Sequence, residues 1–267
     1  LGYKIVYEPS ASVFHHHGIH QGGNQTRLKN IVNIIQSHSK NFSQGNLDPK
    51  KLNIIAIIPS KGPLKKISKD VLIKHTINKA KESKYINKIV VSTDNKETKK
   101  FAIKNGAECP FIRPKKFSLA DVNLRTVQRF SLSELEKKNV FPDLVVHLEE
   151  TYPFRDKDFI DDAIKVLLKN GYDTVIAAKE EKGWLWKQNL NEFLRIEEGD
   201  IPGKIKKKTY LGLHGICCVT YPEFIREGLL IGKNIGLLPV KNSLSIVEIR
   251  DNETYKKFSK ILKKNIS

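Results

Sequence analysis

The sequence predicts an α/β fold in which a mainly parallel sheet is covered by helices on both faces, giving three layers. One pattern in residues 52–267 supports this prediction. Short runs rich in Val and Ile, bounded by turn residues, alternate with stretches of helical length. Strands separated by helices form β-α-β crossovers, which give parallel sheets that are buried on both faces.

The expected strands and helices follow one another along the chain. The strands are expected at 52–58, 88–93, 143–149, 173–178 and 213–220, with a late strand at 243–251. The helices are expected at 71–83, 95–105, 123–138 and 156–170, with a closing helix over 252–265. In open sheets of this kind, ligands bind beyond the carboxyl ends of the strands. The residues that follow each strand are therefore the candidates for a site.

Residues 1–40 differ from the rest of the chain. They contain a short strand and loop followed by one amphipathic helix, and forty residues rarely form a core alone. Residues 41–51 are polar and contain Gly45 and Pro49, which is typical of a linker. The chain begins with Leu and contains no Met. We therefore expect a piece of a longer polypeptide, with the tail of a preceding domain at 1–40 and the main domain at 52–267.

The composition limits the classes of partner. A net charge of +18 favours an anionic partner. The lysines are scattered along most helices, and no arginine-rich block or aromatic platform is present, so nucleic acid is not the expected partner. No apolar stretch is long enough to span a bilayer, and no signal peptide is visible. The three cysteines offer no disulfide framework or zinc spacing, which favours the reducing cytoplasm.

A group of lysines follows the first predicted strand. The stretch IIAIIPSKGPLKKISKD, residues 54–70, runs from apolar strand into Lys61, Lys65, Lys66 and Lys69. Neither a P-loop motif nor a dinucleotide-binding glycine motif is present. Lysines on a loop that precedes a helix can neutralise a polyphosphate, helped by the backbone N–H groups of the helix N-terminus. A solvated, lysine-rich turn is the alternative interpretation.

Charged and hydroxyl side chains also follow the next two strands. They are Asp94 after the second strand, Arg113 and Asp121 in the loop that comes next, and Glu149, Glu150, Thr151 and Arg155 after the third strand. Carboxylates and cations at one sheet edge suit a magnesium–triphosphate complex, because Mg²⁺ takes oxygen ligands and bridges phosphate oxygens.

In their order along the chain, these segments resemble the acylneuraminate cytidylyltransferases, also called CMP-sialic acid synthetases, over about residues 52–262. The segments that carry the resemblance are IIPSKGPLKK, VVSTDN, GAECPFIRPKKFSLADVN, LEETYPFR, HGICCVT and SIVEIRDNETY. The resemblance implies the Rossmann-like fold of nucleotide-diphospho-sugar transferases. It also implies transfer of CMP from CTP to a sugar acid such as sialic acid, release of pyrophosphate, and a need for Mg²⁺. Family members often form homodimers.

The resemblance implies roles for particular residues. The expected nucleotide-binding residues are Ser60, Lys61, Gly62, Lys65, Lys66, Asp94, Arg113, Asp121 and Thr151. Lys61, Lys65 and Arg155 are the expected catalytic residues. Glu248 stands where the family has a metal-binding aspartate, and Asp251 is the expected second metal ligand.

The chain also departs from the family pattern. The first loop lacks an Arg-Gly-Gly, and Lys66 stands where the family has Asn. Glu149-Glu150 replaces Gln-Pro, and Arg250 replaces the second metal-binding aspartate. A cation cannot ligate Mg²⁺, so a carboxylate such as Asp251, Glu149 or Glu150 has to take over or metal binding is weakened. These departures support an alternative function, a catalytically weakened module that binds a nucleotide or nucleotide-sugar and serves an attached glycosyltransferase.

Three further segments have two interpretations each. LGYKIVYEPSASVFHHHGIH at the N-terminus resembles the end of the catalytic domain of family 2 (GT-A) glycosyltransferases, and its histidines (His15, His16, His17 and His20) could chelate a metal. A glycosyltransferase in its own right would rest on residues 1–40 alone. Trp184 and Trp186 either stack on a ligand or form an apolar flap against the sheet or a second subunit. The basic segment 203–210 is either a phosphate clamp or a surface loop.

Overall fold

The structure is a computed structural model that describes residues 47–67, 70–196, 207–251, 253–254 and 256–258. The predicted glycosyltransferase-like tail at 1–40, its histidines and residues 41–46 of the predicted linker lie outside the described residues, as do residues 203–206 of the basic segment. The described end of the linker forms a 3-10 turn, η2 (Pro49–Lys51), capped by the side chain of Asp48.

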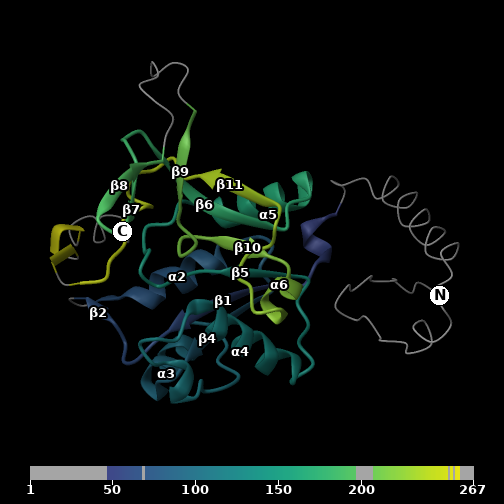
Figure 1. Cartoon of the computed structure of the whole chain (residues 1–267). Coiled ribbons are helices and arrows are strands. Elements are labelled where there is room, and N and C mark those ends of the chain that lie inside the picture. The colour runs from purple at the N-terminus through teal and green to yellow at the C-terminus, as the bar shows by residue number, and fades with distance from the viewer. Residues whose placement is uncertain (1–46, 68–69, 197–206, 252, 255, 259–267) are drawn as a thin grey trace, which may run out of the picture.

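A seven-stranded sheet forms the centre of the described chain (Figure 1). Its strand order is β11-β6-β10-β5-β1-β4, and β9 pairs with β6. The parallel strands are β1 (Ile54–Ser60), β4 (Lys88–Thr93), β5 (Leu144–His147), β6 (Thr174–Glu181) and β11 (Ile235–Pro239). β10 (Cys218–Thr220) runs antiparallel between β5 and β6, and β9 (Thr209–Gly212) runs antiparallel beside β6. The sheet is therefore mainly parallel, as predicted.

Helices pack on both faces of this sheet. Ile54, Ala56 and Ile58 of β1 belong to one apolar cluster, which contains residues of α2 (Leu72–Lys81), α3 (Lys96–Lys104) and α5 (Phe159–Asn170). Ile55 and Ile57 belong to a second cluster with residues of α4 (Leu124–Glu136) and α6 (Pro222–Arg226). Alternate side chains of a strand point to opposite faces, so the strand is buried on both sides. This arrangement confirms the predicted three-layer α/β fold.

Asparagine side chains start the two helices that follow the site loops. The side chain of Asn95 accepts a hydrogen bond from the backbone N–H of Thr98 at the start of α3. The side chain of Asn123 does the same for Thr126 at the start of α4. Such caps satisfy backbone donors that have no partner inside the helix. They fix the point at which each loop turns back from the carboxyl edge of the sheet.

The prediction of a late strand at 243–251 is wrong. The described residues there form turns and an extended segment without strand pairing. Its buried Ile249 packs with Leu72 and Phe154 in a small third cluster, and its backbone N–H donates to the carbonyl of Thr151. The strand predicted at 213–220 is shorter, because a turn at 214–216 separates β9 from β10. The alternating apolar pattern at 243–251 thus reflects packing on a loop.

Several elements were not predicted. They are β2 (Lys66–Ile67) with β3 (Asp70–Val71), the hairpin of β7 (Trp186–Asn189) and β8 (Glu192–Arg195), strand β11 and helix α6. The hairpin and the residues just before it leave apolar side chains in solvent, since Trp184 is 62% and Trp186 is 52% exposed. The described residues therefore do not show the predicted flap against the sheet.

All three cysteines are free and buried. Burial raises the pKa of the Cys109 thiol to about 11 and that of Cys217 to about 12. These thiols stay protonated near neutral pH and behave as core residues. Among the described residues, no helix combines the length and the apolar character that crossing a bilayer requires.

Candidate nucleotide-binding site

A cavity of about 330 Å³ opens beyond the carboxyl ends of β1 and β5. Ser60, Lys61 and Lys65 come to it from the loop after β1, and Thr151 comes from the loop after β5. Its other polar lining residues are Arg113, Ser118, Glu149, Glu150 and Arg250. Leu124 and Val127 of α4 form part of an apolar wall. The strand-end argument thus brings five of the predicted residues together around one hollow.

A buried carboxylate faces the lysines of the first loop. Glu150 is 3% exposed, and its carboxylate lies 2.8 Å from the Nζ atom of Lys65. The Ser60 hydroxyl donates to the same carboxylate at 3.2 Å. A buried charge is costly unless it is paired, so Lys65 compensates Glu150. The Lys65 side chain is 43% exposed, which leaves its ammonium group within reach of a ligand in the cavity.

Gly62 and Asp94 give the first loop its shape. Gly62 has a φ of 73°, in the left-handed region that favours glycine. Its backbone N–H donates to the Asp94 carboxylate at 2.8 Å, and its carbonyl accepts from the Thr98 hydroxyl at 3.2 Å. Asp94 therefore holds the loop after β1 against the start of α3. Asp94 is not among the residues that line the cavity.

Arg113 holds three segments of the site together. Its guanidinium donates to the carbonyls of Ser92 at 2.8 Å and Ser60 at 3.1 Å, and to the Ser118 hydroxyl at 2.9 Å. Arg113 is 2% exposed, and burial lowers the pKa of this guanidinium although the charge of Asp94 opposes the shift. It lines the cavity while its donors bind the ends of β1 and β4. We therefore expect Arg113 to fix the shape of the nucleotide pocket.

The other predicted nucleotide-binding residues lie outside the cavity lining. Asp121 is exposed, although its neighbour Val122 lines the cavity. Lys66 begins β2, directly after Lys65, and its side chain lies outside the part of the chain that is described.

Comparison with known proteins decides the family. The sequence model of the cytidylyltransferase family matches residues 58–198, more than half of the chain. The chain belongs to the cytidylyltransferase family. The matched segment contains the loop after β1, Arg113 and the loop after β5, which are the parts that build the cavity.

Curated relatives of this cytidylyltransferase chain support the resemblance to CMP-sialic acid synthetases. It is 27% identical to N-acylneuraminate cytidylyltransferase A of Danio rerio over 231 residues, covering 78% of this chain and 51% of the relative. It is 29% identical to pseudaminic acid cytidylyltransferase of Campylobacter jejuni over 134 residues, covering 47% and 58%. It is also 29% identical to CMP-N,N'-diacetyllegionaminic acid synthase of Legionella pneumophila, covering 46% and 57%. The chain spans about half the length of these relatives.

Solved structures share the fold of this cytidylyltransferase chain. One is a CMP:2-keto-3-deoxy-manno-octonic acid synthetase complexed with CTP, with a TM-score of 0.61, 10% identity, and coverage of 80% of this chain and 99% of that one. Another is the 4-diphosphocytidyl-2C-methyl-D-erythritol synthase of Anaerococcus prevotii, with a TM-score of 0.60, 13% identity, and coverage of 81% and 100%. At these identities the likeness shows the fold alone.

Arg155, predicted to be catalytic, is enclosed by the protein. It is 2% exposed and is not among the lining residues of the cavity. Its guanidinium donates to the Thr76 hydroxyl and to the backbone carbonyls of Glu149, Tyr152, Gly215 and Ile216. Because each of its five N–H groups has an acceptor there, Arg155 joins the loop after β5 to the turn before β10. The structure thus gives it a positioning role beside the site.

The two predicted metal ligands lie in different surroundings. Glu248 accepts a hydrogen bond from the Thr151 hydroxyl at 3.2 Å, and it pairs with Arg250 at 2.6 Å. Thr151 and Arg250 line the cavity, so Glu248 lies at its edge. The Asp251 carboxylate accepts from the backbone N–H of Thr254 at 2.7 Å and from the Thr254 hydroxyl at 3.1 Å. Asp251 is thus engaged in a local turn.

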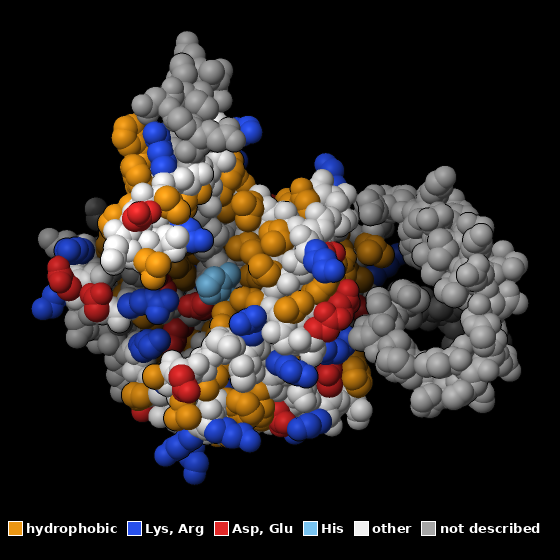
Figure 2. All heavy atoms as spheres, in the orientation of Figure 1, with side chains coloured by type: hydrophobic (Ala, Val, Ile, Leu, Met, Phe, Trp, Pro, Cys, Tyr) orange, Lys and Arg blue, Asp and Glu red, His pale blue; other side chains and the backbone are white. Residues whose placement is uncertain are grey.

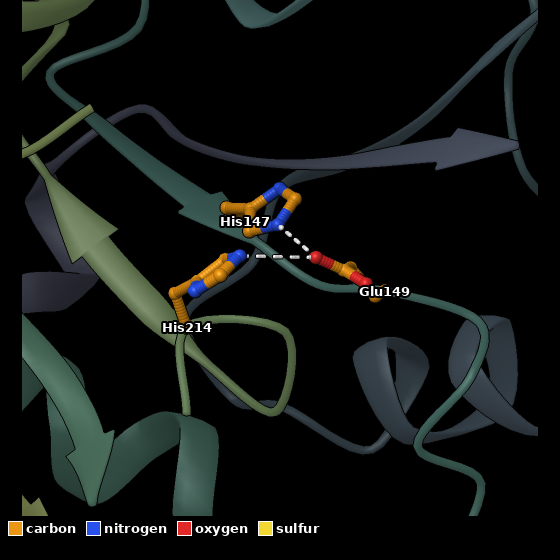
Figure 3. A group of neighbouring side chains, drawn as sticks. All are labelled: His147, Glu149 and His214. Carbon is orange, nitrogen blue, oxygen red and sulfur yellow. Dashed lines mark ion pairs between the residues drawn. The ribbon is translucent and has the colours of Figure 1, made fainter. Parts of the chain in front are cut away.

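Sequence reasoning missed a cluster of three side chains, His147, Glu149 and His214 (Figure 3). The Oε1 atom of Glu149 lies 3.5 Å from Nε2 of His147 and 3.2 Å from Nε2 of His214. His147 ends β5, and Glu149 follows two residues later. Residues two apart in an extended chain point to the same side, and this spacing could have indicated that the two side chains lie together. On the face shown in Figure 2, a histidine lies beside acidic and basic side chains near the middle of the molecule.

These three side chains shift one another's pKa. Burial of Glu149 opposes its ionisation, but its contacts with His147 and His214 and the charges of these two side chains outweigh burial and lower the pKa of the carboxyl. The hydrogen bond to Glu149 raises the pKa of His214, whereas burial lowers the pKa of His147. The turn next to His214 needs Gly215, because a Cβ atom there would lie 2.6 Å from the Tyr152 ring and 2.9 Å from the Glu149 carboxyl.

Proposed function

We propose that this chain is a nucleotidyltransferase that transfers CMP from CTP to a sugar acid of the sialic-acid type and releases pyrophosphate. The single observation that carries the proposal is the cavity that gathers Ser60, Lys61 and Lys65 opposite Thr151 at the carboxyl ends of β1 and β5. The matched relatives are named for N-acylneuraminate, pseudaminic acid and N,N'-diacetyllegionaminic acid, which supports a sugar acid as the acceptor.

The cavity suits the charge changes of this reaction. An acceptor hydroxyl oxygen forms a bond to the α-phosphorus of CTP, the bond from that phosphorus to the β-bridging oxygen breaks, and the hydroxyl proton is released. Negative charge grows on the departing pyrophosphate, where fixed cations stabilise the transition state. Lys61 and Lys65 provide such cations. Lys65 balances Glu150, and we expect it to share its charge with the phosphates of CTP when CTP binds.

We propose Mg²⁺ as the cofactor. Mg²⁺ keeps several waters and is held by one or two carboxylates together with substrate phosphates, where it neutralises phosphate charge. Glu248 at the edge of the cavity fits such a role. Arg250 now pairs with the Glu248 carboxylate. Mg²⁺ and the Arg250 guanidinium would compete for that carboxylate, so Arg250 would have to move toward the phosphates. Asp251, held by Thr254, contributes less to this proposal.

The activity can be tested with the full chain, CTP, Mg²⁺ and a panel of eight- and nine-carbon sugar acids. We expect pyrophosphate release that requires one of the acids. Replacing Lys61 with methionine should lower kcat/KM by about 100-fold, because a charge contact to the phosphates is lost. The matched control is Lys169→Met, since Lys169 is exposed on α5. No release with any acid, combined with no CTP binding, would overturn the proposal.

The second candidate function is a module that binds a nucleotide or nucleotide-sugar without turnover. It is favoured by the positions of Glu149 and Arg250, which line the cavity and depart from the family pattern. Titration calorimetry would distinguish the two functions. CTP binding without pyrophosphate release supports the module, and turnover with any sugar acid excludes it. An upstream glycosyltransferase domain and a cytoplasmic location stay predictions.

We also propose that two copies of the chain associate through the β7–β8 hairpin. Its exposed apolar side chains support this, because Leu190 is 89% and Phe193 is 65% exposed in addition to the two tryptophans. Such patches are typical of association surfaces. Light scattering after gel filtration should give the mass of a dimer, and the variant Trp186→Ser/Phe193→Ser should give a monomer. As a control, Phe141→Ser, at another exposed position, should stay dimeric. A monomeric wild-type chain would contradict the proposal.

A further inference from the structure

We propose that His147, Glu149 and His214 together bind one divalent transition-metal ion of the zinc class. Its three ligands differ from Glu248, where Mg²⁺ is proposed, although the Thr151 hydroxyl contacts both Glu149 and Glu248. Nothing in the site requires CTP or a sugar acid. Two imidazoles and one carboxylate are a ligand set that zinc accepts in proteins. Their ligand atoms all lie within 4.8 Å of one another.

The distances between the ligand atoms fit a metal ion. For metal–ligand bonds of about 2.1 Å at tetrahedral angles, two ligand atoms lie about 3.4 Å apart. The observed distances from Glu149 Oε1 are 3.5 Å to His147 Nε2 and 3.2 Å to His214 Nε2. Hydrogen bonds between nitrogen and oxygen are shorter, about 2.9 Å, and a distance of 3.5 Å is too long for a good one. The separations therefore match ligands around an ion better than hydrogen-bonded partners.

One ligand nitrogen has no hydrogen bond to any residue that the structure describes. His147 is 1% exposed, and its Nε2 atom has no hydrogen-bond partner among the described residues. A buried polar atom without a partner is costly, and in native structures it calls for an explanation such as a missing ion. Figure 3 shows this nitrogen pointing toward Glu149, and the ring of His214, below that of His147, faces the same oxygen. A cation between the three side chains would satisfy all of them.

Gln128 supports the other nitrogen of His147. The side-chain amide of Gln128, on α4, lies 2.5 Å from Nδ1 of His147, and the Oε1 atom of Gln128 has no partner in the part of the chain that is described. Turning the amide by 180° places Oε1 against Nδ1, so that Nδ1–H donates and Nε2 presents a lone pair. Metal-binding histidines usually have such an acceptor behind them. Gln128 is therefore a positioning residue of this site.

Two of the ligands line neighbouring cavities, whose linings share Leu124. Glu149 lines the nucleotide-binding cavity, whereas His214 lines a second cavity of about 430 Å³ with Ile176 and Leu229. Three protein ligands leave a fourth coordination position for water or for an oxygen atom of a bound molecule. Catalytic zinc sites have this open position, whereas structural zinc sites have four protein ligands. An ion here would be reachable from solvent, because His214 is 48% exposed.

Metal binding is tested on the full chain after removal of ions with a chelator. The background variant carries alanine at His15, His16, His17 and His20, because these N-terminal histidines could bind metal themselves. We expect equilibrium dialysis against Zn²⁺ alone to give one ion per chain and Zn²⁺ to raise the melting temperature. Co²⁺ in place of Zn²⁺ should give the visible absorption of a four- or five-coordinate ion.

Variants distinguish a metal site from a hydrogen-bonded cluster. His214→Asn and Glu149→Gln keep a polar side chain, and circular dichroism checks their folding. Both should lose the ion and the Zn²⁺-induced rise in melting temperature, and Gln128→Met should weaken binding by about 10- to 100-fold. His75→Asn, in α2, is the matched control and should bind like the background variant. No bound Zn²⁺, or binding that His214→Asn and Glu149→Gln leave unchanged, overturns the proposal. Neither result bears on CTP turnover.

Discussion

Replacing Arg155 with methionine is expected to lower the free energy of unfolding by about 3 kcal/mol or more. Arg155 is 2% exposed, and it donates to four backbone carbonyls and one hydroxyl. Methionine fills much of the same volume but donates no hydrogen bond. Each buried acceptor that loses its donor costs about 1–3 kcal/mol, and relaxation of the loops recovers part of the sum.

Urea denaturation of both proteins measures this difference. Arg155→Lys is the matched variant, because a lysine keeps the charge but has only three donors, without the planar fork of arginine. We expect it to lose less stability than Arg155→Met and more than 1 kcal/mol. A change below 1 kcal/mol for Arg155→Met would show that the five contacts do not hold the loops together. Folded Arg155→Lys with low kcat and normal stability would return Arg155 to a catalytic role.

Replacing Lys65 with methionine is expected to lower kcat/KM for CTP by about 100- to 1,000-fold. Two effects act in the same direction. The change removes a cation from the cavity, and it leaves Glu150, which is 3% exposed, without its ion-pair partner. An uncompensated carboxylate then repels the triphosphate that has to bind beside it. Steady-state kinetics and calorimetry with CTP measure the loss.

The double variant Lys65→Met/Glu150→Gln separates these effects. Because it removes both charges of the pair, it should recover the melting temperature of the wild type and part of the CTP affinity. It should not recover kcat, since the cation near the phosphates is still missing. Glu150→Gln alone is the control for the glutamine. Normal kinetics in Lys65→Met would show that Lys65 serves the stability of Glu150 and not the substrate.

The parallel part of the fold could be predicted because its strands are runs of β-branched residues. β1 and β4 lie within a few residues of the expected ranges. The direction of β10 could not be predicted, since HGICCVT has the same apolar pattern whichever way the strand runs. β11 contains Gly and Pro, which hide an edge strand. The segment 243–251 has the right alternation, but Ile249 is buried by loop packing and not by sheet pairing.

Part of the site followed from the rule that ligands bind at strand ends. That rule placed Ser60, Lys65 and Thr151 together around the cavity. It could not place His214 beside Glu149, because the turn that carries His214 reaches Glu149 through the antiparallel pairing of β10 with β5 and a bond from the Glu149 N–H to the Gly215 carbonyl. The role of Arg155 was also hidden, since a sequence does not show whether a guanidinium faces a ligand or the backbone carbonyls around it. Burial and hydrogen bonding decide that, and both require coordinates.

Strand β10 determines when the sheet can close during synthesis. It is the only strand between β5 and β6 in the described sheet, although it follows both in sequence. A nascent chain that ends before residue 218 therefore leaves the β10-facing edge of β5 without a partner. In the described sheet β6 then has only β9 to pair with, since β11 also comes later in the chain. Unpaired strand edges invite intermolecular pairing. Residues 218–220 have to leave the ribosome before β10 can join β5 to β6. Premature termination or slow translation after β6 therefore leaves an aggregation-prone intermediate.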